Sequence, residues 1–84
     1  MNSVEIYTKS QCPYCSHAKA LLDARNIAYK EFDVGGDQGV FTEMVSRTGG
    51  RTLPQIIIND QVIGGFDDLH KIDSKGQLTS LLAT

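Results

Sequence analysis

Hydrophobic and polar side chains follow two different periods along this chain, and these periods predict its secondary structure. In residues 3–8 and 27–34, apolar positions alternate with small or polar ones, which is typical of strands. Between them, residues 14–26 carry small and apolar side chains at spacings of three and four, the period of a helix with one buried side. Pro13 suits the first turn of that helix. The first part of the chain is therefore predicted to be strand, helix, strand.

A second helix is predicted after Gly35-Gly36, which break the strand pattern. Asp37 can cap its first turn, and its apolar face continues to Gly49-Gly50, a flexible exit of the kind found at helix C-termini.

A hairpin is predicted next. Residues 55–58 and 61–63 are β-branched runs, and Asn59-Asp60 between them tolerate the positive φ angles of a two-residue turn. Gly64-Gly65 end the second run.

The chain closes with a helical region that Asp67 or Asp68 can cap and that Gly76 is expected to interrupt. The predicted order is β-α-β-α-β-β-α, in which the first two strands are parallel and the hairpin is antiparallel. We therefore expect an α/β fold: a four-stranded mixed sheet flanked by helices, forming one domain over residues 1–84.

Charge and composition exclude several classes of function. Of the 84 residues, 21% are charged and the net charge is −2, so there is no general attraction to nucleic acid or to anionic lipid. No apolar run approaches the roughly 20 residues that span a bilayer, and residues 1–5 lack the pattern of a signal peptide. A cytoplasmic location is expected, where structural disulfides are rare and a lone cysteine pair indicates chemistry.

Cys12 and Cys15 lie between the first predicted strand and helix, where a C-x-x-C sequence is typical of a redox motif. Two cysteines three apart on a starting helical turn can bring their Cα atoms within the roughly 4.4–6.8 Å that a disulfide tolerates. Cys12 is expected to meet the unpaired N–H groups of the helix start, whereas Cys15 lies one turn inside on the apolar side. Cys12 is therefore the predicted nucleophile and Cys15 its resolving partner.

A reactive Cys12 thiolate needs several contributions. A free cysteine has a pKa near 8.5, and lowering it by about 3 units requires roughly 4 kcal/mol, whereas a helix dipole typically contributes about 0.3–1 kcal/mol. Direct N–H hydrogen bonds, with Lys9 as a candidate nearby cation, must supply the rest.

Two alternatives stay open from the residues alone. The cysteines can be half of a zinc site completed by His17 and His70, or they can be buried structural side chains. Because His17 lies two positions from Cys15, it points about 160° around the helix from it, which is poor geometry for a shared metal.

Three motifs in order give the chain a close resemblance to the glutaredoxins, particularly the small bacterial dithiol type. They are Cys12-Pro13-Tyr14-Cys15, Arg51-Thr52-Leu53-Pro54-Gln55-Ile56-Ile57-Ile58 and Gly64-Gly65-Phe66-Asp67-Asp68-Leu69. The resemblance covers nearly the whole chain and implies a thioredoxin fold, glutathione as reductant, and no permanently bound cofactor or metal.

The resemblance also implies a glutathione groove around a cis-proline. Pro54 corresponds to that proline, a bond that the sequence alone would not predict because only about 5–6% of X–Pro bonds are cis. The residue before it pairs its backbone with the glutathione cysteine, as a short antiparallel strand would. Leu53 has that role here and is a mild departure from the usual valine.

The ends of glutathione are assigned by the same resemblance. Asp68 would hold the ammonium of the γ-glutamyl end, and the helix start at Asp67 would offer N–H groups to its carboxylate. Lys9 and Arg51 would attract the glycyl carboxylate. The groove would also be lined by Tyr14 and Thr52.

The resulting hypothesis is a monomeric, cytoplasmic oxidoreductase that reduces protein disulfides and glutathione mixed disulfides, with ribonucleotide reductase as one candidate partner. The rivals are a redoxin recharged by thioredoxin reductase, and a non-enzymatic module that binds zinc or a glutathione-ligated [2Fe–2S] cluster through Cys12.

Overall fold

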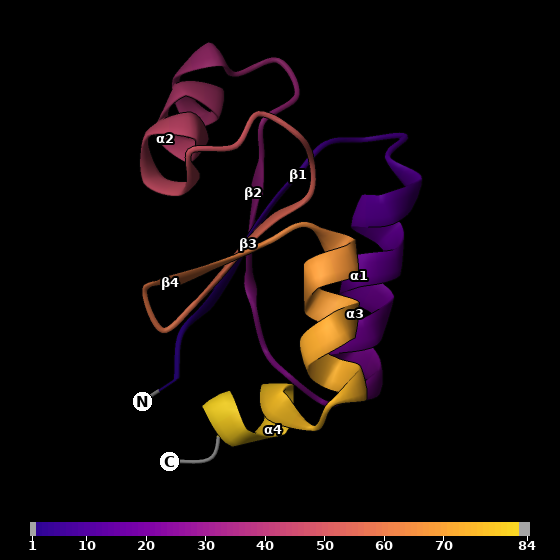
Figure 1. Cartoon of the computed structure of the whole chain (residues 1–84). Helices are drawn as coiled ribbons and strands as arrows, with labels where there is room; N and C mark the ends of the chain where they lie inside the picture. Colours follow the sequence, from indigo (N-terminus) through magenta and orange to yellow (C-terminus); the bar gives the residue numbers. More distant parts are fainter. Residues whose placement is uncertain (1, 83–84) are drawn as a thin grey trace.

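Four strands form one mixed sheet in the computed structural model, which describes residues 2–82 (Figure 1). Their order across the sheet is β2-β1-β3-β4, and their bounds are Val4–Thr8 for β1, Lys30–Asp33 for β2, Gln55–Ile58 for β3 and Gln61–Gly64 for β4. β1 is parallel to β2 and antiparallel to β3, and β3 is antiparallel to β4. The predicted sheet, with a parallel first pair and a closing hairpin, is confirmed.

Helices cover both faces of the sheet. α1 (Pro13–Ala24) and α3 (Phe66–Ser74) pack against each other on one face, and α2 (Gln38–Thr48) lies on the other (Figure 1). The short α4 (Gln77–Leu81) follows α3, and the glycine between them, Gly76, has a φ of 73°. The predicted interruption of the last helical region is confirmed.

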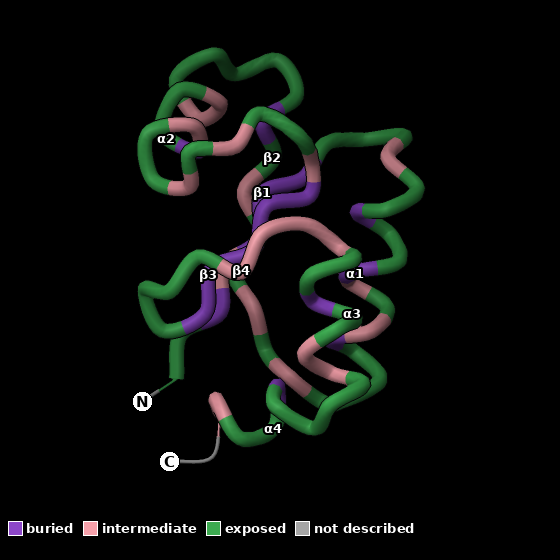
Figure 2. Tube along the Cα trace, viewed as in Figure 1, coloured by how far each residue is buried: buried purple, intermediate pink, exposed green. Residues whose placement is uncertain are grey.

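The alternation of side chains along β1 and β3 explains the two layers, because successive strand residues point to opposite faces. Buried residues therefore concentrate along these central strands (Figure 2). One core lies between the sheet and α1, α3 and α4, and consists of Val4, Ile6, Ala18, Leu22, Ile56, Ile58, Leu69 and Leu78. The other lies under α2 and consists of Tyr7, Val34, Met44 and Ile57.

The predicted caps and turns are present. The Asp37 side chain accepts the N–H groups of Gly39 and Val40 at 3.0 and 3.2 Å, so Asp37 is the N-cap of α2. Asn59 and Asp60 have φ angles of 51° and 64°, as a tight hairpin between β3 and β4 requires.

The strand expected over 27–34 is shorter than predicted. α1 ends at Ala24 and Asn26 has a φ of 58°, so the chain turns back and the Ile27 N–H donates to the Leu22 carbonyl at 2.9 Å. Ile27 is thus part of the helix C-terminal turn, and its apolar side chain packs against the core on the α1 side. β2 begins only at Lys30. No helix within residues 2–82 has both the length and the apolar character needed to cross a bilayer.

Candidate active site around the cysteine pair

Cys12 and Cys15 lie where β1 leads into α1, and a disulfide joins them. Their Cα atoms are 5.2 Å apart, inside the range predicted from the motif. Cys12 is the N-cap of α1, and its Sγ accepts the backbone N–H of Cys15 at 3.2 Å. The Cys12 sulfur therefore occupies the place toward which the unpaired N–H groups of the helix point, where a negative charge is stabilised.

The two sulfurs differ in accessibility. Cys15 is buried, with 1% of its surface exposed, on the side of α1 that faces the core. Cys12 is half-buried at the helix end. An incoming sulfur can therefore reach Cys12, while Cys15 is shielded behind it.

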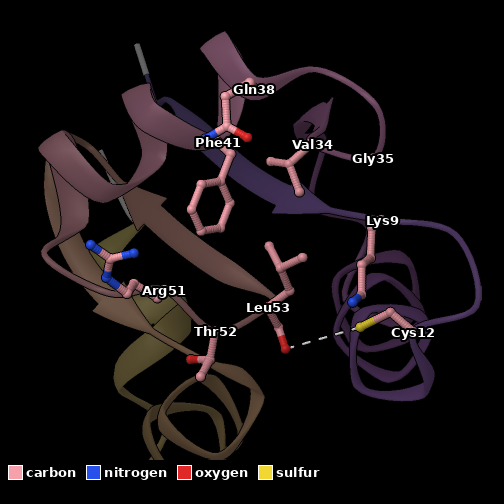
Figure 3. A pocket seen from close by; sticks show the side chains of 9 residues that line it. All are labelled: Lys9, Cys12, Val34, Gly35, Gln38, Phe41, Arg51, Thr52 and Leu53. Atoms are coloured by element: carbon pink, nitrogen blue, oxygen red, sulfur yellow. Dashed lines mark hydrogen bonds between the residues drawn. The ribbon is translucent and has the colours of Figure 1, made fainter.

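The loop before β3 lies opposite Cys12. The Leu53–Pro54 peptide bond is cis, as the resemblance implied, and Pro54 is fully buried. The Leu53 carbonyl oxygen lies 4.0 Å from the Cys12 Sγ (Figure 3). The Leu53 backbone and the Cys12 sulfur thus face the same space.

A cavity of about 580 Å³ opens beside Cys12 (Figure 3). Two cations predicted as site residues line it: Lys9, whose amine points toward Cys12, and Arg51 on the far side. Within residues 2–82 neither forms an ion pair with another side chain. Both charges are available to an anion in this cavity.

Sequence reasoning missed four residues of this cavity. Val34 and Gly35 follow β2, while Gln38 and Phe41 belong to the first turns of α2. A signal for them was present: because β1 and β2 are parallel, the segments that follow both strands leave the sheet at the same edge. The segment after β2 therefore lies beside the segment that carries Cys12.

A second cavity of about 280 Å³ lies on the other side of Leu53. It shares Thr52 and Leu53 with the first cavity, so the two flank the loop before β3 as one discontinuous groove. Its lining brings together the remaining predicted residues and the start of α3: Tyr14, Thr52, Leu53, Pro54, Gly65, Phe66, Asp67 and Asp68. All eight residues assigned to glutathione binding thus line one or other cavity.

Asp68 has a structural contact as well. Its Oδ2 accepts the Gly65 N–H at 3.1 Å, which satisfies a donor at the start of α3. Gly64, with a φ of 114°, lies so close to this carboxylate that a Cβ at that position would collide with it. Asp68 thus caps α3 from the third position of the helix, while the N-cap residue is Gly65; α3 begins earlier than a cap at Asp67 or Asp68 would place it.

The two histidines surround an aromatic side chain instead of the cysteines. The ring centroids of His17 and His70 lie 5.7 and 5.8 Å from that of Phe66, and Tyr14 lies 6.2 Å from it. In the part of the chain that the structure describes, no three His, Cys, Asp or Glu side chains gather as a metal-binding group. The arrangement gives a zinc site built from Cys12, Cys15 and these histidines no support.

A polar network fastens α2 to the sheet. Arg47 of α2 binds both carboxylate oxygens of Glu5, at 2.9 and 3.1 Å, and donates to the hydroxyl of the buried Tyr7 at 2.9 Å. That hydroxyl donates to Glu43 at 2.7 Å. The hydrogen bond from Arg47 lowers the pKa of Glu5, and burial raises the pKa of Tyr7. This network fixes the helix that supplies Gln38 and Phe41 to the cavity.

A second contact fixes the end of β1. The hydroxyl of the buried Thr8 donates to Glu31 at 2.6 Å, and Lys19 of α1 pairs with the same oxygen at 3.0 Å. The hydrogen bond from Thr8, followed by that from Lys19, lowers the pKa of Glu31. β1, β2 and α1 are thereby joined next to Lys9, where the segment leading to Cys12 begins.

Comparison with known proteins agrees with this geometry. The family model described as Glutaredoxin matches residues 4–63. The chain is similar to Glutaredoxin 3 of Escherichia coli (strain K12), with 48% identity over 82 residues that cover 98% of this chain and 99% of that protein. It is also 49% identical to a probable glutaredoxin of Synechocystis sp. (strain ATCC 27184 / PCC 6803 / Kazusa), over 96% of this chain and 75% of the relative.

Solved structures resemble it in the same way. A crystal structure of a buckwheat glutaredoxin–glutathione complex has a TM-score of 0.87 and 27% identity, covering 98% of this chain and 77% of that one. The solution structure of a glutaredoxin from Brucella melitensis has a TM-score of 0.83 and 42% identity, covering 95% and 87%. The four-stranded sheet with its flanking helices is thus a thioredoxin fold. By family model, sequence and structure, the chain belongs to the glutaredoxin family.

Proposed function

We propose that this chain reduces glutathione mixed disulfides and protein disulfides with Cys12 as the nucleophile and Cys15 as the resolving thiol. Members of the glutaredoxin family are thiol–disulfide oxidoreductases that use glutathione as reductant. The observation that carries the assignment is the position of Cys12, which is half-buried at the start of α1 and faces the Leu53 backbone across the larger cavity.

With a glutathione mixed disulfide, Cys12 alone completes the reaction. Its thiolate attacks the glutathione sulfur, the disulfide breaks, and the substrate thiolate leaves and takes a proton from water. A new disulfide now joins Cys12 to glutathione. The thiolate of a second glutathione attacks the bound glutathione sulfur, which releases glutathione disulfide and restores the Cys12 thiolate.

With a protein disulfide, Cys15 takes part. The Cys12 thiolate attacks one substrate sulfur and forms a mixed disulfide, while the second substrate sulfur leaves as a thiolate. The Cys15 thiolate then attacks the Cys12 Sγ, which frees the substrate and closes the Cys12–Cys15 disulfide. Because the two Cα atoms are 5.2 Å apart, the backbone already allows this ring. Two glutathione molecules return the pair to the dithiol.

The charges of the two cavities match the two ends of glutathione, the ligand of the buckwheat relative. On the larger side, Lys9 and Arg51 attract the glycyl carboxylate. On the smaller side, Asp68 accepts from the γ-glutamyl ammonium, and the N–H groups at Asp67 bind its carboxylate.

The middle of glutathione lies between these ends. Leu53 pairs its backbone N–H and carbonyl with the glutathione cysteine, and Pro54 holds that backbone opposite Cys12. Tyr14 and Thr52 line the groove on either side. Since the contact of Leu53 is through the backbone, leucine in place of valine changes packing and preserves binding.

Several contributions lower the pKa of Cys12 after the disulfide opens. The Cys15 N–H, 3.2 Å from the sulfur, donates to a thiolate, and such charge-assisted hydrogen bonds contribute about 1.5–3 kcal/mol. The helix dipole adds about 0.3–1 kcal/mol. The Lys9 amine, which points toward the sulfur, adds a further attraction. Together these approach the roughly 4 kcal/mol that a 3-unit shift requires.

The proposal is tested by a glutathione-coupled reductase assay on a mixed disulfide, with one variant of each cysteine. Cys12→Ser should abolish activity, because a serine hydroxyl is not ionised at neutral pH. Cys15→Ser should keep most of it, because Cys15 does not act on this substrate. Retained activity in Cys12→Ser would contradict the assignment of Cys12 as the nucleophile.

The same assay separates the rivals. Turnover with thioredoxin reductase in place of glutathione and glutathione reductase would identify a redoxin that thioredoxin reductase recharges. The acidic pair Asp67-Asp68 beside the groove supports glutathione as the reductant. Iron–sulfur absorption or stoichiometric zinc in the purified protein would support a metal module bound through Cys12.

The physiological setting follows from the same proposal. Residues 1–84 act as a single glutaredoxin domain and as a monomer in the cytoplasm. The substrates are disulfide-bonded or glutathionylated proteins, with ribonucleotide reductase as one candidate.

A further inference from the structure

Gln55, the first residue of β3, buries a polar side chain directly behind the groove. Its surface is 5% exposed, and its Nε2 donates to the Thr52 carbonyl at 2.9 Å and to the Thr52 hydroxyl at 3.3 Å. Buried amides are costly unless they are hydrogen-bonded, so this side chain is held to Thr52. Gln55 itself does not line either cavity.

The space for this contact comes from Gly50. A Cβ at Gly50 would lie 2.5 Å from the Gln55 Nε2 and 3.0 Å from its Cδ, so any larger residue there would displace the amide. The Gly50 N–H in turn donates to the Thr48 hydroxyl at 3.0 Å. The loop between α2 and β3 is therefore fastened by Thr48 at one end and by Gln55 at the other.

Between these two points the loop is restrained by side-chain packing, since Leu53 packs against the core under α2 and the next residue, Pro54, is fully buried. Within the described chain, no backbone-to-backbone hydrogen bond outside the helices and strands involves residues 51–53. These are the residues that turn toward the groove: Arg51, Thr52 and Leu53 all line the larger cavity (Figure 3). Packing fixes the Leu53 side chain, and with no backbone hydrogen bond of this kind the orientation of its N–H and carbonyl depends also on how firmly the adjacent Thr52 is held.

We propose that Gln55 is a positioning residue for glutathione binding, acting through Thr52 on the Leu53 backbone. The inference rests on the proposed function, because it assumes that Leu53 pairs with the glutathione cysteine. That pairing is made both in the bound substrate and in the transition state, so loosening it weakens binding uniformly. Cys12 is held by α1, and its sulfur accepts the Cys15 N–H at 3.2 Å, a closer contact than the 4.0 Å to the Leu53 carbonyl. Its thiolate is therefore expected to keep its pKa when Gln55 is replaced.

The test is Gln55→Leu, which keeps a similar volume and removes both donors. With a glutathionylated peptide as substrate, KM should rise about tenfold, the effect of one lost hydrogen bond, while kcat stays within about twofold. The pKa of Cys12, read from the pH dependence of its alkylation, should not change. Gln61→Leu makes the same substitution at the first, exposed residue of β4 and should leave all three quantities unchanged.

Any other pattern in Gln55→Leu overturns the inference: an unchanged KM, or a kcat or Cys12 pKa that changes with it. If the leucine variant does not fold, Gln55→Glu, which keeps the shape but replaces the donors by acceptor oxygens, decides by the same criteria. Failure here is distinct from failure of the proposed function, which would already appear as activity in Cys12→Ser of the otherwise unaltered chain.

Discussion

Cys12 and Asp68 are the two residues at which local structure and proposed chemistry use the same contact. The Cys12 sulfur caps α1, and the Asp68 carboxylate caps α3. At both positions the donors at the start of a helix hold a group that also faces the groove. Variants that keep the cap but change the charge therefore separate folding from binding.

Lys9 is expected to contribute modestly to the Cys12 thiolate, because its amine points toward the sulfur but is exposed. Lys9→Gln should raise the pKa of Cys12 by roughly half a unit, the size of one solvent-screened charge interaction. The pH dependence of alkylation in the reduced protein measures this shift. Lys75→Gln, which removes an exposed cation after α3, is the matched control and should not move it.

Asp68→Asn should weaken glutathione binding while leaving stability nearly unchanged. The asparagine oxygen can still accept the Gly65 N–H, but the attraction to the γ-glutamyl ammonium is lost. We expect KM for a glutathionylated peptide to rise about tenfold, as for one charge-assisted contact. Asp68→Ala should show the same raised KM as Asp68→Asn. Its free energy of unfolding should also fall by about 0.5–1 kcal/mol, because the cap of α3 is lost. Equal KM values for wild type and Asp68→Asn would contradict a role of Asp68 in glutathione binding.

At the scale of elements, the period of hydrophobic positions predicted β1, β2, α1 and α2, and β-branched runs around a turn predicted β3 and β4. The errors occurred at the ends of elements. The strand over 27–34 was predicted too long because Ile27 is apolar in both arrangements; periodicity does not show that its N–H is already used by Leu22. The hairpin turn was predictable because Asn and Asp tolerate positive φ angles whatever the rest of the fold, and Asn59 and Asp60 adopt them.

α2 is the element most dependent on a polar network. Arg47→Met should lower the free energy of unfolding by about 0.5–1 kcal/mol at pH 7, a value reduced by solvent screening because both side chains are partly exposed. The pKa of Glu5 lies below its ordinary value of 4.5 in the folded protein, so its contribution is present above pH 4.5 and is lost as pH falls through the folded pKa. The difference between wild type and Arg47→Met should therefore shrink below pH 4.5.

Denaturant unfolding at several pH values measures this difference. Lys75→Met, which removes an exposed cation without an ion pair among residues 2–82, is the control and should be nearly as stable as wild type. An Arg47→Met effect that stays constant down to pH 3 would show that the network does not act through the Glu5 charge.

For the molecule as a whole, the groove is a product of tertiary structure, and the sequence revealed it only in part. The spacing of Cys12 and Cys15 indicated the redox motif, whereas the residues proposed to bind glutathione came from the family resemblance. Phe41 lies in the helix predicted after Gly35-Gly36, but nothing local to α2 indicates that its first turns meet the segment after β1. That meeting follows from the parallel pairing of β1 and β2.

The cis bond before Pro54 shows the same limit. Local chemistry favours the trans form, and it is the surrounding fold that holds the Leu53 carbonyl opposite Cys12. Gln55, which fastens the neighbouring Thr52, was predicted only as a strand residue, since its partner is a carbonyl that sequence patterns do not mark.

The most direct measurement is a titration of the reduced protein, following the ultraviolet absorbance of the thiolate in the Cys15→Ser variant so that one sulfur is observed. With N–H donors, a helix terminus and Lys9 around it, Cys12 should ionise with a pKa below about 7. A pKa near 8.5, that of an unperturbed thiol, would contradict the assignment of Cys12 as the nucleophile.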